Sequence, residues 1–107
     1  MSVEQEAKVY LGKGFINLDG AVKYITSLLG TELTEYEEDN LMEGSFLTPS
    51  GFPLDSCQEC SWTGKGFYIG RDITDELSLA TIDIEKKGLS SFMPEKDIDI
   101  HFFVQYY

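Results

Sequence analysis

Residues 97–107 read D-I-D-I-H-F-F-V-Q-Y-Y, and apolar residues occupy every second position of this stretch. The apolar set is Ile98, Ile100, Phe102, Val104 and Tyr106. The residues between them are mostly polar, namely Asp97, Asp99, His101, Phe103 and Gln105. Because successive side chains of a strand point to opposite faces, this pattern predicts a strand over about 98–106 with one buried face. We expect it to be an interior or near-interior strand, with Phe102 in the core.

Four earlier segments also have the composition of strands, and they cover residues 6–15, 45–48, 65–71 and 77–85. In the first, apolar residues recur at every second position from Ala7 to Leu11, and we expect Gly12 and Gly14 to end the strand. In the last, Ala80, Ile82 and Ile84 alternate with polar residues and are predicted to face the core. The sequence Lys86-Lys87-Gly88 is then expected to form a turn.

One segment has the period of an amphipathic helix. Its apolar stripe consists of Leu18, Ala21, Val22, Ile25 and Leu29. Asn17 or Asp19 can cap the N-terminus, and Gly30 is placed where a helix often ends in the left-handed conformation. The spacing predicts a helix over about 19–29.

The segment 31–43 leaves two alternatives open. Thr34 and Glu37 have the spacing of a capping box, and Gly44 can stop a helix. Its apolar residues are few: Leu33, Tyr36, Leu41 and Met42. A short, mostly exposed helix and an acidic loop are both compatible with this pattern.

These segments predict one α+β domain over residues 1–107. We expect a mostly antiparallel sheet of four to five strands, with one main helix (about 19–29) packed on one face. Residues 49–64 contain Pro49, Gly51 and Pro53 and are expected to form a long irregular loop. Loops of that length are often functional.

The charge of the chain restricts its partners. It has 19 acidic and 8 basic residues, a formal net charge of −11. Direct binding to nucleic acid or to an anionic membrane is disfavoured, because those surfaces attract clusters of Lys and Arg. A basic protein partner is favoured. The first residues lack the apolar core of a signal peptide, and no apolar run has the length of a membrane span, so we predict a cytoplasmic protein.

Six acidic residues fall within twelve positions, with no basic residue among them. They are Glu32, Glu35, Glu37, Glu38, Asp39 and Glu43, and with Tyr36 they form the predicted partner-binding set. On a helix, Glu35, Asp39 and Glu43 would share one face, where like charges four residues apart oppose helix formation slightly. The run is either a solvated surface or a docking patch. Candidate aromatic anchors beside it are Tyr36, Phe46 and Trp62.

The two cysteines, Cys57 and Cys60, form a C-x-x-C sequence. A zinc site would need two further ligands, for which only His101 and a carboxylate such as Asp55 offer themselves. A thioredoxin-type motif would lie at the start of a helix, whereas residues 61–64 are not helical in character. The simplest interpretation is two reduced cysteines in a loop, without metal or cofactor.

No catalytic signature is found. The sequences Gly12-Lys13-Gly14 and Gly64-Lys65-Gly66 lack the spacing of phosphate-binding loops, and a single histidine leaves little room for a nucleophilic triad. We predict that the chain is not an enzyme.

The functional hypothesis is a small acidic protein that binds and inhibits a basic protein, with a nuclease as the leading candidate. Two roles fit: an immunity protein or antitoxin that covers a toxin's active site, or a phage-encoded nucleic-acid mimic that blocks a defence nuclease. The alternatives are a small metal- or redox-active protein using Cys57 and Cys60, and an adaptor or chaperone-like module that binds a peptide along the sheet edge.

Overall fold

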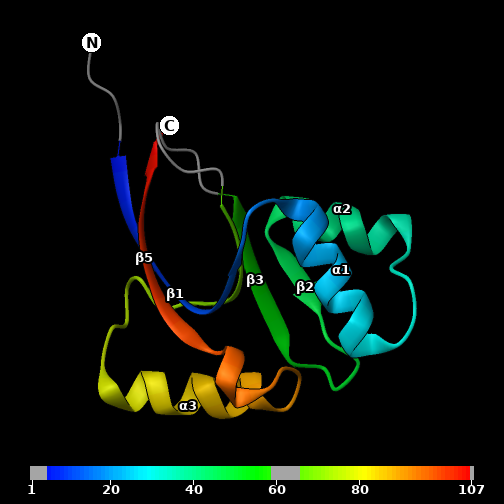
Figure 1. Ribbon diagram of the computed structural model, residues 1–107. Coiled ribbons are helices and arrows are strands. Elements are labelled where there is room, and N and C mark those ends of the chain that lie inside the picture. The colour runs from blue at the N-terminus through cyan, green and yellow to red at the C-terminus, as the bar shows by residue number, and fades with distance from the viewer. Residues whose placement is uncertain (1–4, 59–65, 107) are drawn as a thin grey trace.

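A long, bent first strand organises the sheet. The computed structural model describes residues 5–58 and 66–106. The strands are β1 (Gln5–Phe15), β2 (Ser45–Leu47), β3 (Pro53–Gln58), β4 (Phe67–Asp72) and β5 (Asp99–Tyr106). They form one five-stranded antiparallel sheet in the order β2-β3-β4-β1-β5, shown in Figure 1. The predicted α+β fold with an antiparallel sheet is confirmed.

Three helices accompany the sheet instead of one main helix. They are α1 (Leu18–Leu29), α2 (Glu35–Glu43) and α3 (Leu79–Ser90), and a 3-10 turn covers Glu95–Asp97. The prediction of α1 is confirmed together with its ends. The Asn17 side chain accepts a hydrogen bond from the Gly20 N–H at 3.0 Å, and Gly30 ends the helix in the left-handed conformation.

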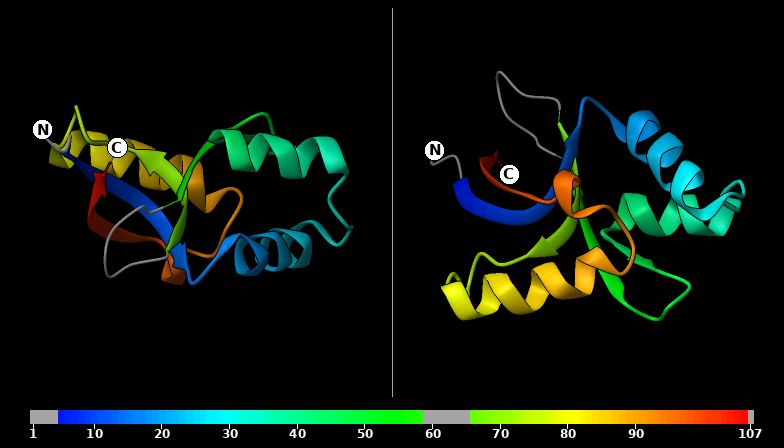
Figure 2. Two further views of the ribbon diagram at one scale, coloured as in Figure 1. Left: turned by 90° about the horizontal axis from the view of Figure 1, so that it is seen from above. Right: turned by 60° about the horizontal axis from the view of Figure 1, so that its bottom comes forward.

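One apolar core joins the helices to the sheet. From the strands it takes Val9, Leu11, Phe46, Leu54, Phe67 and Ile69, and from the helices Ala21, Ile25, Leu41 and Leu89. α1 and α3 contact the central strands β1 and β4, whereas α2 contacts β2 and β3. Figure 2 shows that α2 and β5 lie at opposite ends of the molecule.

The prediction that Gly12 and Gly14 end the first strand is wrong. β1 continues to Phe15, and Gly12 lies directly opposite Gly70 of β4. A Cβ atom on Gly12 would lie 2.0 Å from the Ile69 carbonyl oxygen, and one on Gly70 would lie 2.0 Å from the Leu11 carbonyl oxygen. The two backbones approach too closely for any side chain, so glycine is required at this pair of positions.

The last strand is present, but its predicted face and its predicted place in the sheet are wrong. β5 is an edge strand. Phe102 is 69% exposed, and Phe103 is only 7% exposed. Phe103 stacks on the Tyr68 ring at a centroid distance of 4.2 Å and lies 5.7 Å from the Tyr10 ring. These aromatic neighbours occupy the sheet face opposite the one bearing Val9 and Leu11, and they explain why Phe103 is the buried ring.

The segment 77–85 is not a strand. Residues Leu79–Ser90 form α3. Ser78 caps the N-terminus of this helix, because its hydroxyl oxygen accepts the Thr81 N–H at 3.1 Å. Ile84 is 68% exposed, and the predicted turn at 86–88 lies inside the helix. Leu89 is buried and Glu85 pairs with Arg71 at 2.8 Å, which fixes the side of α3 that faces the sheet.

The predicted loop over 49–64 is wrong in its central part. Residues Pro53–Gln58 form β3, which pairs with β2 on one side and with β4 on the other. The turn before β3 is closed by Thr48, whose hydroxyl donates to the Phe52 carbonyl oxygen at 2.8 Å and accepts the Phe52 N–H at 3.0 Å. These hydrogen bonds hold residues 48–52 in a turn, where Pro49 and Gly51 predicted part of a long irregular loop.

Candidate functional site

The acidic run forms helix α2, which resolves the choice between a helix and a loop. The capping box is complete: Glu37 N–H donates to the Thr34 hydroxyl at 3.2 Å, and Thr34 N–H donates to the Glu37 carboxylate at 3.0 Å. Gly44 ends the helix in the left-handed conformation. Three acidic residues lie in the first turn, where the helix dipole favours negative charge and offsets their mutual repulsion.

α2 is anchored to the sheet by one buried residue. Leu41 is fully buried, and its carbonyl oxygen accepts a hydrogen bond from the Ser56 hydroxyl of β3 at 2.6 Å. The opposite side of the helix is therefore turned to solvent. Glu35, Asp39 and Glu43 are exposed there, and the exposed side chains of Tyr36 (75%) and Met42 (67%) flank them on the helix surface. We call these five residues the acidic stripe.

The remaining acidic residues of the predicted set have other positions. Glu37 is half-buried and is held by the capping box, so it serves the helix itself. Glu32 and Glu38 line a hollow of about 380 Å³ between α1 and α2, together with Lys23. The structure thus brings Glu35, Asp39 and Glu43 together with Tyr36, and places Glu32 and Glu38 beside them.

The carboxylates of the stripe have no cationic partner in the part of the chain that the structure describes. No Lys, Arg or His occurs between Lys23 and Lys65. Five cations instead pair with other carboxylates: Lys8, Lys13, Lys23, Arg71 and Lys86. Among the described residues, the acidic stripe is therefore a concentration of negative charge without paired cations.

Of the two candidate aromatic anchors that the structure describes, Tyr36 is exposed, within the acidic stripe, and Phe46 is not. Phe46 was predicted to be exposed, but it is 3% exposed and packs 6.3 Å from the Phe92 ring in the core. Its place in β2 turns it inward, opposite Leu54 of β3. Trp62 lies outside the described residues. Met42 takes the second apolar position instead; its place on a helical wheel, next to Glu35 and Asp39, is the signal that marks it.

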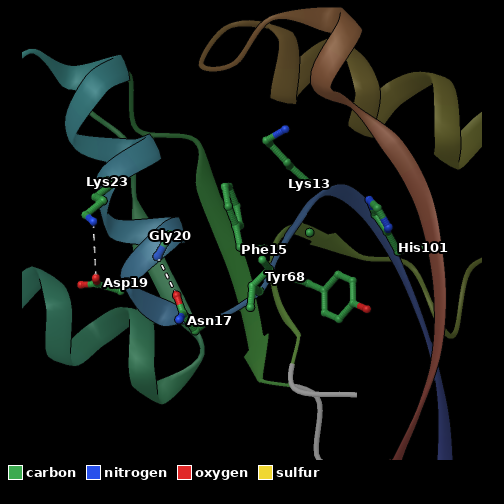
Figure 3. Close-up of a pocket in the computed structure, with 10 residues that line it drawn as sticks. Lys13, Phe15, Asn17, Asp19, Gly20, Lys23, Tyr68 and His101 are labelled. Carbon is green, nitrogen blue, oxygen red and sulfur yellow. Dashed lines mark hydrogen bonds and ion pairs between the residues drawn. The ribbon is translucent and has the colours of Figure 1, made fainter. Parts of the chain in front are cut away.

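A second candidate site is a shallow pocket of about 700 Å³ between the start of α1 and the sheet, shown in Figure 3. Lys13, Lys23 and His101 line it beside the Tyr68 ring. Lys23 pairs with Asp19 at 3.6 Å. Lys13 lies 3.9 Å from an Asp97 carboxylate oxygen, and His101 Nε2 lies 3.2 Å from the Gly12 carbonyl oxygen. Among the described residues, both lysines that line the pocket are thus paired with carboxylates.

Of the two cysteines of the C-x-x-C sequence, the structure describes Cys57. Cys57 lies half-buried in β3 and not in a loop as predicted, while Cys60 lies outside the described residues. Asp55 accepts the Asp72 N–H at 2.8 Å, and His101 lies at the Gly12 carbonyl. Within residues 5–58 and 66–106, no three His, Cys, Asp or Glu side chains gather in a way that could hold a metal ion.

Gly12-Lys13-Gly14 lies within β1, and the second Gly-Lys-Gly sequence begins outside the described residues.

The described helices are too short or too polar to cross a membrane, since the longest, α1 and α3, have 12 residues each.

Comparison of the chain with protein-family models, with curated proteins and with solved structures finds no match.

Proposed function

We propose that this chain binds a basic protein through the acidic stripe and thereby inhibits it. The observation that carries the proposal is the set of exposed carboxylates of α2, which have no cationic partner among the described residues. If this face only kept the protein soluble, Lys residues interspersed among its carboxylates would keep it soluble equally well. A face that repels anions and attracts cations selects its partner.

The stripe has two parts with different roles in binding. Glu35, Asp39 and Glu43 recur every four residues, about 6 Å apart along the helix axis, and present a row of charge that steers a cationic surface into place. Tyr36 and Met42 can be buried against the partner, and buried anchors of this kind slow dissociation. The row of carboxylates therefore raises the association rate, and the anchors lower the dissociation rate.

The class of partner that fits best is a nuclease. A nuclease binds its substrate in a cationic cleft that neutralises phosphates, and a row of carboxylates can occupy such a cleft in their place. Both an immunity protein against a toxin and a phage-encoded mimic of nucleic acid would work in this way, in the cytoplasm where the enzyme meets its substrate.

The test uses two triple charge reversals of equal charge. The first changes the stripe and its flank: Glu35→Lys, Glu38→Lys and Asp39→Lys. The second changes three exposed acidic residues outside α2: Asp75→Lys, Glu76→Lys and Asp83→Lys. Each takes the net charge from −11 to −5, because each of three reversals adds two charges. The partner is first purified from cells that carry the native gene, identified, and assayed for cleavage of DNA and RNA.

The first triple is expected to weaken binding by about 2–5 kcal/mol, since cations would then face cations. The second is expected to change affinity slightly, and mainly through the association rate. Equal losses in both variants would show that only total charge matters and would refute the stripe. A bound partner without nuclease activity would retain the binding surface and refute the nuclease assignment.

A further inference from the structure

The outer part of the sheet beside β5 is only two strands wide in the part of the chain that the structure describes. β1 pairs with β4 from Tyr10 to Phe15, but it pairs with β5 from Gln5 to Gly12. The N-terminal half of β1 and the C-terminal half of β5 therefore run past β4 as a ribbon, seen at the upper left of Figure 1. Two-stranded ribbons are marginally stable in water, and a third strand stabilises them.

The backbone of β5 is oriented to accept such a strand. Val9 lies opposite Phe102, yet the Val9 carbonyl oxygen accepts the Ile73 N–H at 2.9 Å and the Val9 N–H donates to the Thr74 hydroxyl at 3.0 Å. Both polar groups of Val9 thus point away from β5. In an antiparallel pair this makes Val9 and Phe102 a non-hydrogen-bonded pair, so the N–H and C=O of Phe102 point to the open edge. The same holds for Ile100 and Val104, two residues away on either side.

The side chains of these three residues form an apolar face on that edge. Phe102 is 69% exposed, Ile100 41% and Val104 38%. This edge strand has eight residues, and its exposed apolar face lacks the charged side chains by which edge strands usually avoid pairing; Asp99 lies at its first position.

We propose that this edge pairs with a second copy of the chain, β5 against β5 in antiparallel orientation, with Phe102 opposite its own counterpart. In this register Ile100 lies opposite Val104 of the other copy, so apolar residues meet apolar residues along one face. The outward backbone groups of Ile100, Phe102 and Val104 then form the hydrogen-bonded pairs of the new ladder. The arrangement has the two-fold symmetry of most homodimers and joins two sheets into one of ten strands.

The charge distribution permits this pairing despite the net charge of −11 on each copy. Asp99 is the one carboxylate within residues 99–106, and in the proposed register it falls opposite position 105 and not opposite itself. α2 lies at the far end of the sheet from β5, so the acidic stripes of the two copies would be at opposite ends of the dimer (Figure 2). The β5 edge itself carries no row of carboxylates, so it offers no electrostatic attraction to a basic partner strand.

The test compares two Lys substitutions at equally exposed apolar residues. Sedimentation velocity from about 1 µM to about 1 mM should show a species of twice the 12.1 kDa chain mass that increases with concentration. Phe102→Lys should raise the dimer dissociation constant at least about 30-fold, as expected at the centre of an interface. Ile84→Lys, at a side chain that is 68% exposed on α3, should leave that constant unchanged.

Disulfide cross-linking then fixes the register, in a background of Cys57→Ser and Cys60→Ser. Phe102→Cys should cross-link to itself, and Ile100→Cys mixed with Val104→Cys should form mixed dimers, because opposed Cα atoms lie about 5.5 Å apart. Ile100→Cys alone should not cross-link. The proposal is refuted by a monomer at all concentrations, by a dimer that survives Phe102→Lys, or by cross-linking of Ile100→Cys to itself. If Phe102→Lys instead weakens binding to a different protein while the wild type stays monomeric, the edge serves that protein.

Discussion

The two edges of the sheet differ in length, charge and cover. The β2 edge is three residues long and lies beside α2, whose exposed surface is acidic. The β5 edge is eight residues long, and its exposed side chains at Ile100, Phe102 and Val104 are apolar. Short length and nearby charge protect the first edge from pairing with other chains, whereas the second is long and carries a carboxylate only at its first residue, Asp99.

This contrast separates two kinds of surface on one small domain. Charge at the α2 end acts over the Debye length of about 8 Å at physiological ionic strength, and weakens as salt rises. The apolar β5 edge acts only on contact, through hydrogen bonds and burial, so screening by salt does not weaken it. The two proposals can therefore fail independently, and the following variants probe what holds each edge in place.

The largest expected effect lies at the β5 edge. Phe103→Ala should destabilise the fold by about 3–5 kcal/mol, because it removes a ring packed between Tyr10 and Tyr68. Phe102→Ala should change the stability of the monomer by no more than about 0.5 kcal/mol, since that ring is exposed. Urea unfolding at low micromolar concentration measures both. A larger cost at Phe102 than at Phe103 would reverse the two faces of β5.

The next effect concerns the attachment of α2. Leu41→Ala should cost about 2–5 kcal/mol, because Leu41 is fully buried and is the contact that anchors the helix in the core. Its neighbour Met42 is the matched control: it is 67% exposed, and Met42→Ala should stay within about 0.5 kcal/mol. Thermal and urea unfolding give the two values. Similar costs for the two variants would mean that α2 packs through a different side.

The smallest effect involves the tether just before β5. The Tyr24 hydroxyl of α1 donates to the Asp97 carboxylate at 2.7 Å, so Tyr24→Phe should cost about 0.5–1.5 kcal/mol at neutral pH. Burial, and then the hydrogen bond and negative charge of Asp97, raise the pKa of Tyr24 above its ordinary value. An unfolded chain loses this proton near pH 10, while the folded chain keeps it.

The stabilisation from Tyr24 is therefore present below about pH 10 and is lost as the pH rises further. The difference in unfolding free energy between the wild type and Tyr24→Phe should narrow above about pH 10. Urea unfolding at intervals between neutral and alkaline pH measures it. A difference that stays constant over that range would show that Tyr24 titrates alike in the folded and unfolded chains.

Local chemistry alone determined several elements of this protein. A cap at Asn17, an apolar stripe and Gly30 define α1. The Thr34–Glu37 capping box and Gly44 mark the two ends of α2, although the sequence left a loop open as the alternative. These signals need only residues within a few positions of each other, so they are readable before any tertiary contact forms. The clustering of negative charge over 32–43 is also a property of the sequence. The α+β class with its antiparallel sheet could likewise be predicted from the sequence.

Tertiary contacts decided the rest. The paired aromatics Phe102 and Phe103 break the alternation of β5, so both faces are compatible with the pattern, and Tyr10 and Tyr68 select Phe103. The segment from Leu79 fits a period of two or of 3.6, and packing of Leu89 with the Arg71–Glu85 ion pair selects the helix. Gly12 is a strand residue because it pairs with Gly70 of β4. In each case residues distant in the sequence chose between local alternatives of similar free energy.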